Sequence, residues 1–92
     1  MNEFGVRNAQ TWVIFTRLLN DQPRLSLYWD MDPESAPEEL EEEIKDLCRL
    51  HVLRHPSPDE ELVLELLLAS ADAVDYKAVI HQIKGLPDPA LV

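Results

Sequence analysis

The stretch APEELEEEIKDLC, Ala36 to Cys48, carries six carboxylates and a single lysine. It belongs to a wider acidic zone, because nine of the eighteen acids of the chain lie between Asp30 and Asp46, where Lys45 is the one base. On a helix, side chains three or four positions apart lie about 5 to 6 Å from one another, and duplex phosphates recur at a few ångströms per strand. An array of carboxylates can therefore approximate a ladder of phosphates. The chemistry that this zone predicts is the binding of a cationic receptor.

Part of this charge has a purely structural explanation. Glu38 and Glu39 fall in the first turn of a predicted helix, where a negative charge is worth about 0.3 to 1 kcal/mol. Helical spacing also permits two ion pairs, each worth about 0.2 to 0.5 kcal/mol: Glu41 with Lys45, and Asp46 with Arg49. The acids left without an obvious local cation are Asp30, Asp32, Glu34, Glu42 and Glu43. A plain solvated face and a functional acidic surface are both compatible with this pattern.

Cys48, His51 and His55 follow at helical spacing and would align a thiolate and two imidazoles on one face, a possible transition-metal arrangement. Cys48 and His51 border the apolar stripe of the helix, however, and Pro56 should end the helix near His55. We therefore expect a partly buried cysteine and helix-end histidines, with no metal and no cofactor. With two glycines the chain has no Gly-rich phosphate loop, and no Ser/His/Asp or Cys/His set stands out. We do not expect an enzyme.

Two aromatic residues, Tyr28 and Trp29, lie at the start of the acidic zone. Such residues are more often part of the core or its edge than of a ligand site. Trp29 has the additional possibility of anchoring an interface, because aromatic residues are over-represented among interface anchors. The candidate partner-binding set is therefore Asp30, Asp32, Glu34, Glu38, Glu39, Glu42, Glu43, Trp29 and Tyr28.

The composition fits one small folded domain, residues 1–92. A chain of 92 residues with 46% hydrophobic residues supports a single core, and buries roughly 60 to 65% of its unfolded surface. Eighteen acids against eight bases give a formal charge of −10, which repels nucleic acid and anionic membranes. We therefore expect no direct nucleic-acid binding, no membrane binding, and a protein partner with a basic surface.

The single cysteine, Cys48, cannot form an intrachain disulfide, and the first residues lack the basic and apolar pattern of a secretion signal. The most apolar stretch, near Leu62 to Ala69, is too short to span a bilayer. These observations predict a cytoplasmic protein.

Apolar periodicity predicts an all-α fold. The expected helices are 9–20, 36–53, 58–71 and 76–84, with 1–7 as a loose lead-in and 86–92 as a tail. After Glu61, helix 58–71 is apolar on nearly every face except at Glu65, and it should be the buried centre. The segment LSLYWDM, 25–31, alternates as a strand does but has no partner strand, so we favour a short helix or packed turn unless it pairs with another molecule. The result is a compact bundle of three main helices and one or two short ones.

Polar residues mark the expected helix ends. Asn8 and Asp75 are N-cap types, and two capping boxes are predicted, at Ser35 with Glu38 and at Ser57 with Glu60. In the second of these, Pro58 would occupy the first helical position. Gly85 stands where a left-handed C-cap is favoured.

The segment Asn8-Ala9-Gln10-Thr11-Trp12, continuing to Leu18-Leu19-Asn20-Asp21, resembles a group of small phage and plasmid-borne proteins of unknown function that open with Asn-x-x-Thr-Trp. Val74-Asp75-Tyr76 is similar to a second segment common near their ends. The likeness covers the two ends of the chain, and the Pro-rich joints and tail depart from it. It implies a mobile-element origin. As a class, small acidic proteins of this kind are similar to anti-CRISPR and anti-restriction inhibitors, several of which imitate DNA.

Together these features predict a non-enzymatic inhibitor of a host defence complex in the cytoplasm of an infected bacterium. It would bind a basic, DNA-contacting surface, such as the positively charged channel of a CRISPR effector, and block access of nucleic acid. The alternative is a helical interaction module, either a homodimer or an antitoxin-like partner. Its contact would be apolar, formed by helix 9–20 and LSLYWDM.

Overall fold

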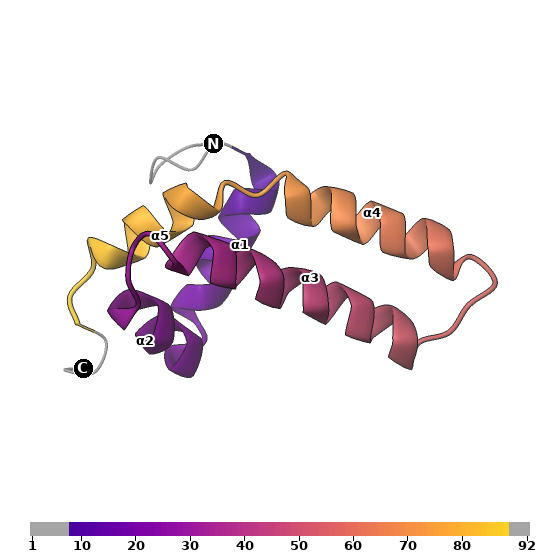
Figure 1. The fold of residues 1–92 in the computed structure, drawn as a ribbon, viewed down its shortest axis with the longest axis horizontal. Coiled ribbons are helices and arrows are strands. Elements are labelled where there is room, and N and C mark those ends of the chain that lie inside the picture. The colour runs from indigo at the N-terminus through magenta and orange to yellow at the C-terminus, as the bar shows by residue number, and fades with distance from the viewer. Residues whose placement is uncertain (1–7, 89–92) are drawn as a thin grey trace.

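The structure, a computed structural model, describes residues 8–88. Within this range the chain is all-α and has no strand, as predicted. Its helices, shown in Figure 1, are α1 (Ala9–Leu19), α2 (Gln22–Asp30), α3 (Ala36–Arg54), α4 (Glu60–Asp72) and α5 (Tyr76–Lys84). The predicted lead-in, 1–7, and the end of the predicted tail, 89–92, lie outside the described residues.

The segment LSLYWDM is helical and forms most of α2, which confirms the preference for a short helix over a strand. Leu25 and Tyr28, three residues apart, are buried together, whereas Leu27 is exposed. The alternation of apolar residues along 25–31 therefore does not mark one buried face. Asp21 starts the helix, because its carboxylate accepts a hydrogen bond from the backbone N–H of Arg24 at 3.3 Å.

Two of the predicted N-caps are confirmed. Asn8 Oδ1 accepts from the backbone N–H of Thr11 at 2.8 Å, and Asp75 Oδ1 accepts from that of Ala78 at 3.1 Å. Each side chain thus satisfies a backbone donor that has no partner inside the helix. These bonds begin α1 and α5 at the residues that the sequence indicated.

Three other predicted capping interactions do not form, although α3 begins after Ser35 and α5 ends before Gly85 as expected. Ser35 makes no side-chain capping bond, so the capping box with Glu38 does not form. The second box fails because Ser57 Oγ accepts from the backbone N–H of Asp59 at 3.1 Å, which leaves a turn before α4 starts at Glu60. Gly85 has φ of −77°, so α5 ends without a left-handed residue.

The core lies where α1, α2 and α5 meet the first half of α3. Its members are apolar side chains from all four helices and from the turn before α5: Phe15, Leu18, Leu25, Tyr28, Ala36, Leu40, Val74, Tyr76, Val79, Ile80 and Ile83. Trp12 and Ile44 pack at its edge. The base of the molecule is therefore a four-helix cluster to which α4 contributes little.

The second half of α3 projects from this base. At 1.5 Å per residue, its 19 residues span about 28 Å, whereas α1, α2 and α5 have 9 to 11 residues. Beyond the reach of those helices, α3 has α4 as its companion, and the two form a projecting hairpin (Figure 1). The extents are 46 × 26 × 23 Å and the radius of gyration is 14.1 Å, against about 12 Å for a compact domain of this length. The predicted compact bundle is in this respect wrong.

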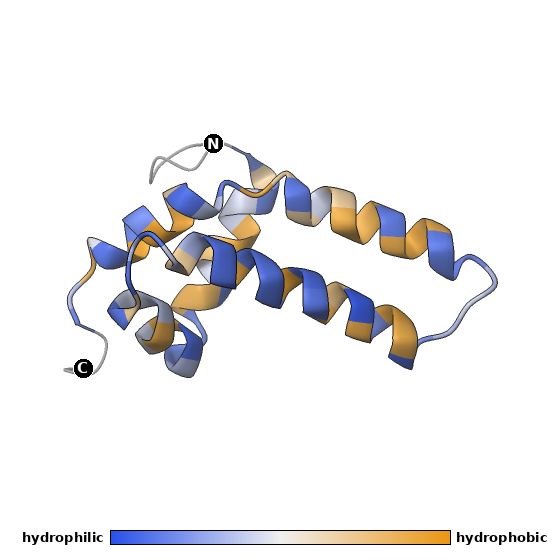
Figure 2. Cartoon of the chain, in the orientation of Figure 1, coloured by the Kyte–Doolittle hydropathy of each residue, from blue (hydrophilic) through white to orange (hydrophobic). Residues whose placement is uncertain are grey.

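Helix α4 is not the buried centre that its composition predicted. Its one buried residue is Ala71, while Leu62 and Leu66 are 57% and 61% exposed. The reason is topological, because only α3 packs along α4 and one neighbour can cover one face. Figure 2 shows the apolar residues of the hairpin continuing well past the base of the molecule.

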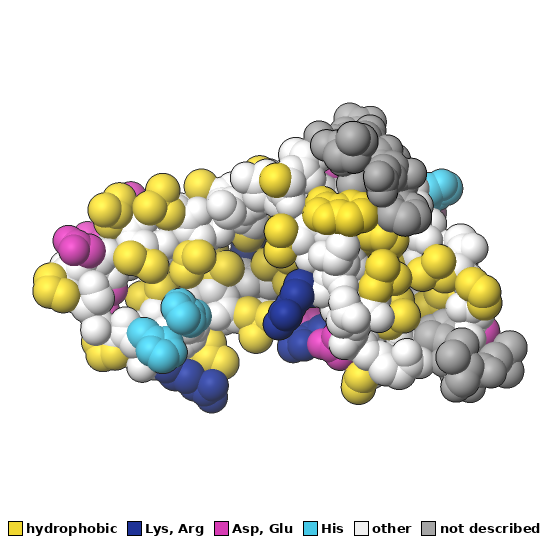
Figure 3. Space-filling model, turned by 180° about the vertical axis from the view of Figure 1, so that it is seen from behind, with side chains coloured by type: hydrophobic (Ala, Val, Ile, Leu, Met, Phe, Trp, Pro, Cys, Tyr) yellow, Lys and Arg dark blue, Asp and Glu magenta, His cyan; other side chains and the backbone are white. Residues whose placement is uncertain are grey.

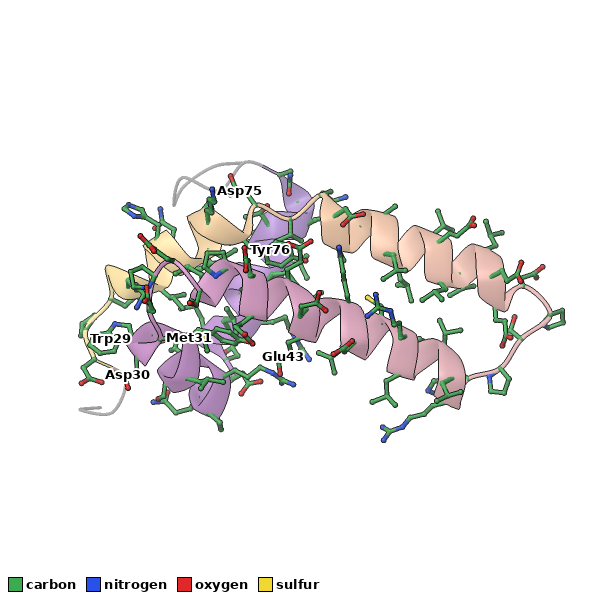
Figure 4. The ribbon with its side chains drawn as sticks, in the orientation of Figure 1. Trp29, Asp30, Met31, Glu43, Asp75 and Tyr76 are labelled. Carbon is green, nitrogen blue, oxygen red and sulfur yellow. The ribbon has the colours of Figure 1, made fainter. Side chains whose placement is uncertain are left out.

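Hydrogen bonds join the start of α1 to the turn between α4 and α5. Asn8 Nδ2 donates to the carbonyl of Ala73, and the backbone N–H of Asp75 donates to Thr11 Oγ1, both at 2.8 Å. The hydroxyl of Tyr76 donates to the carbonyl of Ala71 at 2.6 Å, and Figure 4 shows Asp75 and Tyr76 at this junction. Burial raises the pKa of Tyr76 to about 12. These bonds fix the angle at which the hairpin leaves the base.

A second set of bonds joins α2 to α5. The ammonium of Lys84 donates to the backbone carbonyls of Trp29 at 2.8 Å and Met31 at 2.5 Å. The indole N–H of Trp29 donates to the carbonyl of Leu86 at 3.0 Å. Lys84 therefore satisfies carbonyls that the end of α2 leaves free, and its charge suits the helix C-terminus.

Candidate functional site

The acids of α3 point in different directions. Glu41 turns toward α4, where Lys45 pairs with both Glu41 and Asp72 at 2.8 Å. This bridge confirms the predicted pair and raises the pKa of Lys45, chiefly through its hydrogen bond to Asp72. It also ties α4 to α3. Glu41 is therefore part of the structure of the hairpin and not of an open acidic surface.

Glu43 is also bound inside the molecule. Its carboxylate accepts from Arg24 Nε at 2.9 Å and from the hydroxyl of Tyr28 at 2.5 Å, and Arg24 reaches Asp21 at 2.7 Å. No local cation was expected for Glu43, and its partner, Arg24 on α2, is distant in sequence and cannot be found from helical spacing. Burial, followed by this hydrogen bond, raises the pKa of Tyr28. Figure 4 shows Glu43 on the side of α3 that faces α2.

The exposed acids of α3 are Glu38, Glu39, Glu42 and Asp46. Asp46 forms the predicted pair with Arg49 at 2.9 Å, and both side chains are more than half exposed, so the pair is worth at most about 1 kcal/mol. These four residues follow one another at spacings of one to four, so they occupy the outer side of one helix. This row is the part of the acidic zone that α3 itself presents at the surface.

A groove lies between α2 and α3 beside this row. It has a volume of about 460 Å³. Its apolar side is formed by Leu27, Leu47 and Leu50, with the ring of Tyr28. Its acidic side is formed by Glu39, Glu42, Glu43 and Asp46. We call this feature the acidic groove.

The acids at the start of the predicted array lie beside a second hollow, so Glu38 belongs both to the outer row of α3 and to this hollow. Glu34 and Glu38 line a different hollow, of about 530 Å³, together with Lys77 and His81 of α5. Glu34 therefore shares this hollow with two basic side chains from a helix that is distant in sequence. Asp32 caps its own turn, where its carboxylate accepts from the backbone N–H of Glu34 at 2.9 Å. The single array expected from the sequence is thus divided between two sides of α3.

The two aromatic candidates serve the fold. Tyr28 is buried with its hydroxyl bound to Glu43, and Trp29 is half-buried with its indole N–H bound to Leu86. Figure 4 places Asp30 beside Trp29 at the end of α2, away from Glu43. Asp30 is exposed there and does not line the acidic groove. Of the aromatic pair, only the ring of Tyr28 reaches that groove.

Cys48 and the histidines do not converge. The thiol of Cys48 points to the carbonyl of Leu67 on α4 at 3.9 Å, and burial raises its pKa. The rings of His51 and His55 lie against each other, with centroids 4.6 Å apart, at the exposed end of the hairpin. Over residues 8–88 no group of three or more His, Cys, Asp or Glu is arranged to hold a metal ion. In the same range no helix is long and apolar enough to cross a membrane.

The sequence interpretation missed the leucines of the acidic groove. Leu47 was assigned to the apolar stripe of its helix and Leu27 to the alternating segment 25–31, while Leu50 was not singled out, yet all three are exposed. A signal was present in the spacing Leu47-x-x-Leu50-x-x-Leu53, which moves across the face of α3 and away from Leu40 and Ile44. Whether these leucines are buried or exposed depends on how far the other helices extend along α3.

Comparison with known proteins gave no significant match to a family model, to a curated protein or to a solved structure. What the chain does is therefore argued from its own geometry. Carboxylates beside exposed leucines suit lysine and arginine side chains, because their aliphatic stems pack on apolar surface while their charged ends reach the acids.

Proposed function

We propose that this chain is a non-enzymatic binding protein that uses the acidic groove and the outer row of α3 to occupy a basic surface on another protein. The observation that supports this most directly is the groove itself, in which Glu39, Glu42 and Asp46 stand beside Leu27 and Leu50. Isolated surface acids give long-range attraction alone, whereas an apolar floor adds the short-range contact that holds a bound side chain.

The proposed partner is a protein whose basic surface normally contacts DNA, and the proposed outcome is exclusion of that DNA. The exposed carboxylates recur along α3 at a spacing comparable to that of phosphates, and the charge of −10 speeds encounter with a cationic surface. A defence complex that holds DNA in a positively charged channel, such as a CRISPR effector, has the required chemistry. The short-motif resemblance to mobile-element proteins supports the same choice.

The structure changes which residues should be tested. Glu43 is unsuitable for charge reversal because it is bound to Arg24 and Tyr28, so its loss would disturb the fold. Glu39 and Glu42 are exposed and line the acidic groove. A matched control exists in Glu60 and Glu61, which are equally charged, exposed and placed in the first turn of α4.

The experiment is capture of partners from a lysate of bacteria that carry defence systems, using the tagged chain at about 0.1 M and 1 M salt. The wild type and the Glu60→Lys/Glu61→Lys control should retain the same basic protein at low salt, and Glu39→Lys/Glu42→Lys should lose it. High salt should release it, because the Debye length falls from about 10 Å to about 3 Å. Duplex DNA added to the low-salt sample should displace the chain. Equal retention by both double variants, or no competition by DNA, would rule the proposal out.

The alternative function, an apolar interaction module, draws support from a different place than expected. The sequence assigned its contact to helix 9–20 and LSLYWDM, but Phe15, Leu18 and Leu25 are in the core. The exposed leucines lie instead along the hairpin.

A further inference from the structure

Helix α3 has an exposed leucine stripe on the side turned away from α4. On the side that faces α4, Cys48 is half-buried and Val52 is buried. Leu50 lies two residues from each of them and therefore on the opposite side of the helix. Leu47, Leu50 and Leu53 are 42%, 38% and 76% exposed. Figure 1 shows α2 beside the first half of α3, with no helix covering this side of the second half.

The charges around this stripe differ at its two ends. Toward the base, the stripe enters the acidic groove, where Asp46 and Glu42 stand beside Leu47. Toward the tip, the last turn of α3 carries Arg54, with two histidines nearby, and no acid occurs from 47 to 58. Seen from behind in Figure 3, hydrophobic side chains cover much of the hairpin, and histidine and arginine side chains gather at its end.

This distribution is self-complementary about Leu50. Leu47 and Leu53 lie three residues before and after it, and Asp46 and Arg54 lie four residues before and after it. In an antiparallel pair of identical helices related by a two-fold axis, residue i meets residue j and j meets i. A two-fold axis near Leu50 therefore places Leu47 of each copy opposite Leu53 of the other copy. It likewise places Asp46 of each copy opposite Arg54 of the other.

We propose that a second copy of this chain docks antiparallel along the leucine stripe of α3, with the basic tip of each hairpin at the acidic groove of the other copy. The contact is a two-fold dimer built around Leu50. It goes beyond the proposed function and does not depend on it, because it concerns the isolated chain. Since both contacts use the acidic groove, the second copy and a basic partner protein would compete for it.

The acidic groove adds one more exposed leucine to the stripe. Leu27 is 54% exposed and lines the groove that would receive the tip of the second copy. Together with the stripe it makes four exposed leucines, which would contribute to the apolar part of an interface of standard size, about 800 Å² per partner. Leucines on two helices that meet over this length would be covered by the second copy.

The first test measures the mass of the full chain by sedimentation equilibrium between about 1 and 200 µM. The wild type should dimerise, and Leu50→Lys should raise the dissociation constant at least tenfold because it sets two like charges at the axis. The matched control is Leu66→Lys, an equal change on the exposed side of α4, which should leave the constant within about twofold. The dimer should persist at 1 M salt, unlike the charge-led binding of the proposed function. A monomer at 200 µM, or a dimer lost in Leu66→Lys and kept in Leu50→Lys, overturns the inference.

The second test examines the antiparallel register. Arg54→Glu and Asp46→Arg should each weaken dimerisation about tenfold, since each sets like charges level across the interface. The double variant Arg54→Glu/Asp46→Arg should recover most of that loss. Both residues are exposed, so the fold should be retained, which circular dichroism verifies. Additive losses in the double variant would overturn this register.

Discussion

The hydroxyl of Thr11 accepts a hydrogen bond from the backbone N–H of Asp75 at 2.8 Å, across 64 residues of sequence. Thr11 is fully buried, and next to this bond Asn8 donates to the carbonyl of Ala73. The two short segments on which the resemblance to mobile-element proteins was based therefore meet in space. Their polar residues have a structural role here, in joining the first helix to the start of the last one.

Replacement of Thr11 by valine should destabilise the chain by about 1 to 3 kcal/mol, because it removes the hydroxyl that accepts from the partly buried N–H of Asp75 while keeping the volume. Urea unfolding followed by circular dichroism measures this loss. The control is Thr16→Val, at which the wild-type hydroxyl donates to carbonyls of its own helix, at Trp12 and Val13. Its effect should stay within about 0.5 kcal/mol. Equal losses in the two variants would contradict the role of Thr11.

Glu43 and Glu42 should separate stability from binding. Glu43→Gln weakens bonds to Arg24 and Tyr28 at a site that is about one-third exposed, so we expect a loss of about 1 to 2 kcal/mol after allowance for solvent screening. Glu42→Gln removes an exposed charge and should change the free energy of unfolding by less than about 0.5 kcal/mol. Chemical unfolding at pH 7 gives both values. The assignment of Glu43 to the fold fails if its variant is as stable as the wild type.

The stability of the chain should fall in alkaline solution because of Tyr76. Burial raises its pKa from 10.0 to about 12 in the folded state. The contribution of the protonated Tyr76 hydroxyl to stability is complete below the pKa of this group in the unfolded chain. It is lost as the pH rises through the pKa of the folded chain, because the unfolded chain releases the proton first. The loss from this group should reach about 1.4 kcal/mol near pH 11. Unfolding free energies at about pH 8 and pH 11 measure it, and Tyr76→Phe should show a correspondingly smaller fall. An unchanged fall in that variant would show that Tyr76 does not cause it.

Lys84 should matter far more than the neighbouring lysine of the same helix. Lys84→Met removes the donor to the carbonyls of Trp29 and Met31, and should cost about 1 to 2 kcal/mol. Lys77→Met, at an exposed position of α5, is the matched control and should cost less than about 0.5 kcal/mol. Thermal or urea unfolding of the Lys84→Met and Lys77→Met variants measures the two losses of stability. Trp29 fluorescence should also change in the Lys84 variant alone, because its indole lies beside this junction.

The sequence determined the helices because their signals are local. Apolar spacing and the caps at Asn8 and Asp75 depend on residues within one turn, so α5 was predicted with both ends correct and α1 to within one residue. Ion pairs at i+3 and i+4, such as Glu41 with Lys45, were predictable for the same reason. The acidic face of α3 was likewise visible in the sequence as a density of charge.

What each of these side chains does was decided by the tertiary structure. Glu43 found Arg24 on another helix, and Leu62 and Leu66 of α4 remained exposed although their segment was the most apolar in the chain. The physical reason is that burial and charge pairing depend on which helix lies beside a residue. Spacing along α3 fixes the direction of Leu50, but only the shortness of α1, α2 and α5 leaves that direction open to solvent.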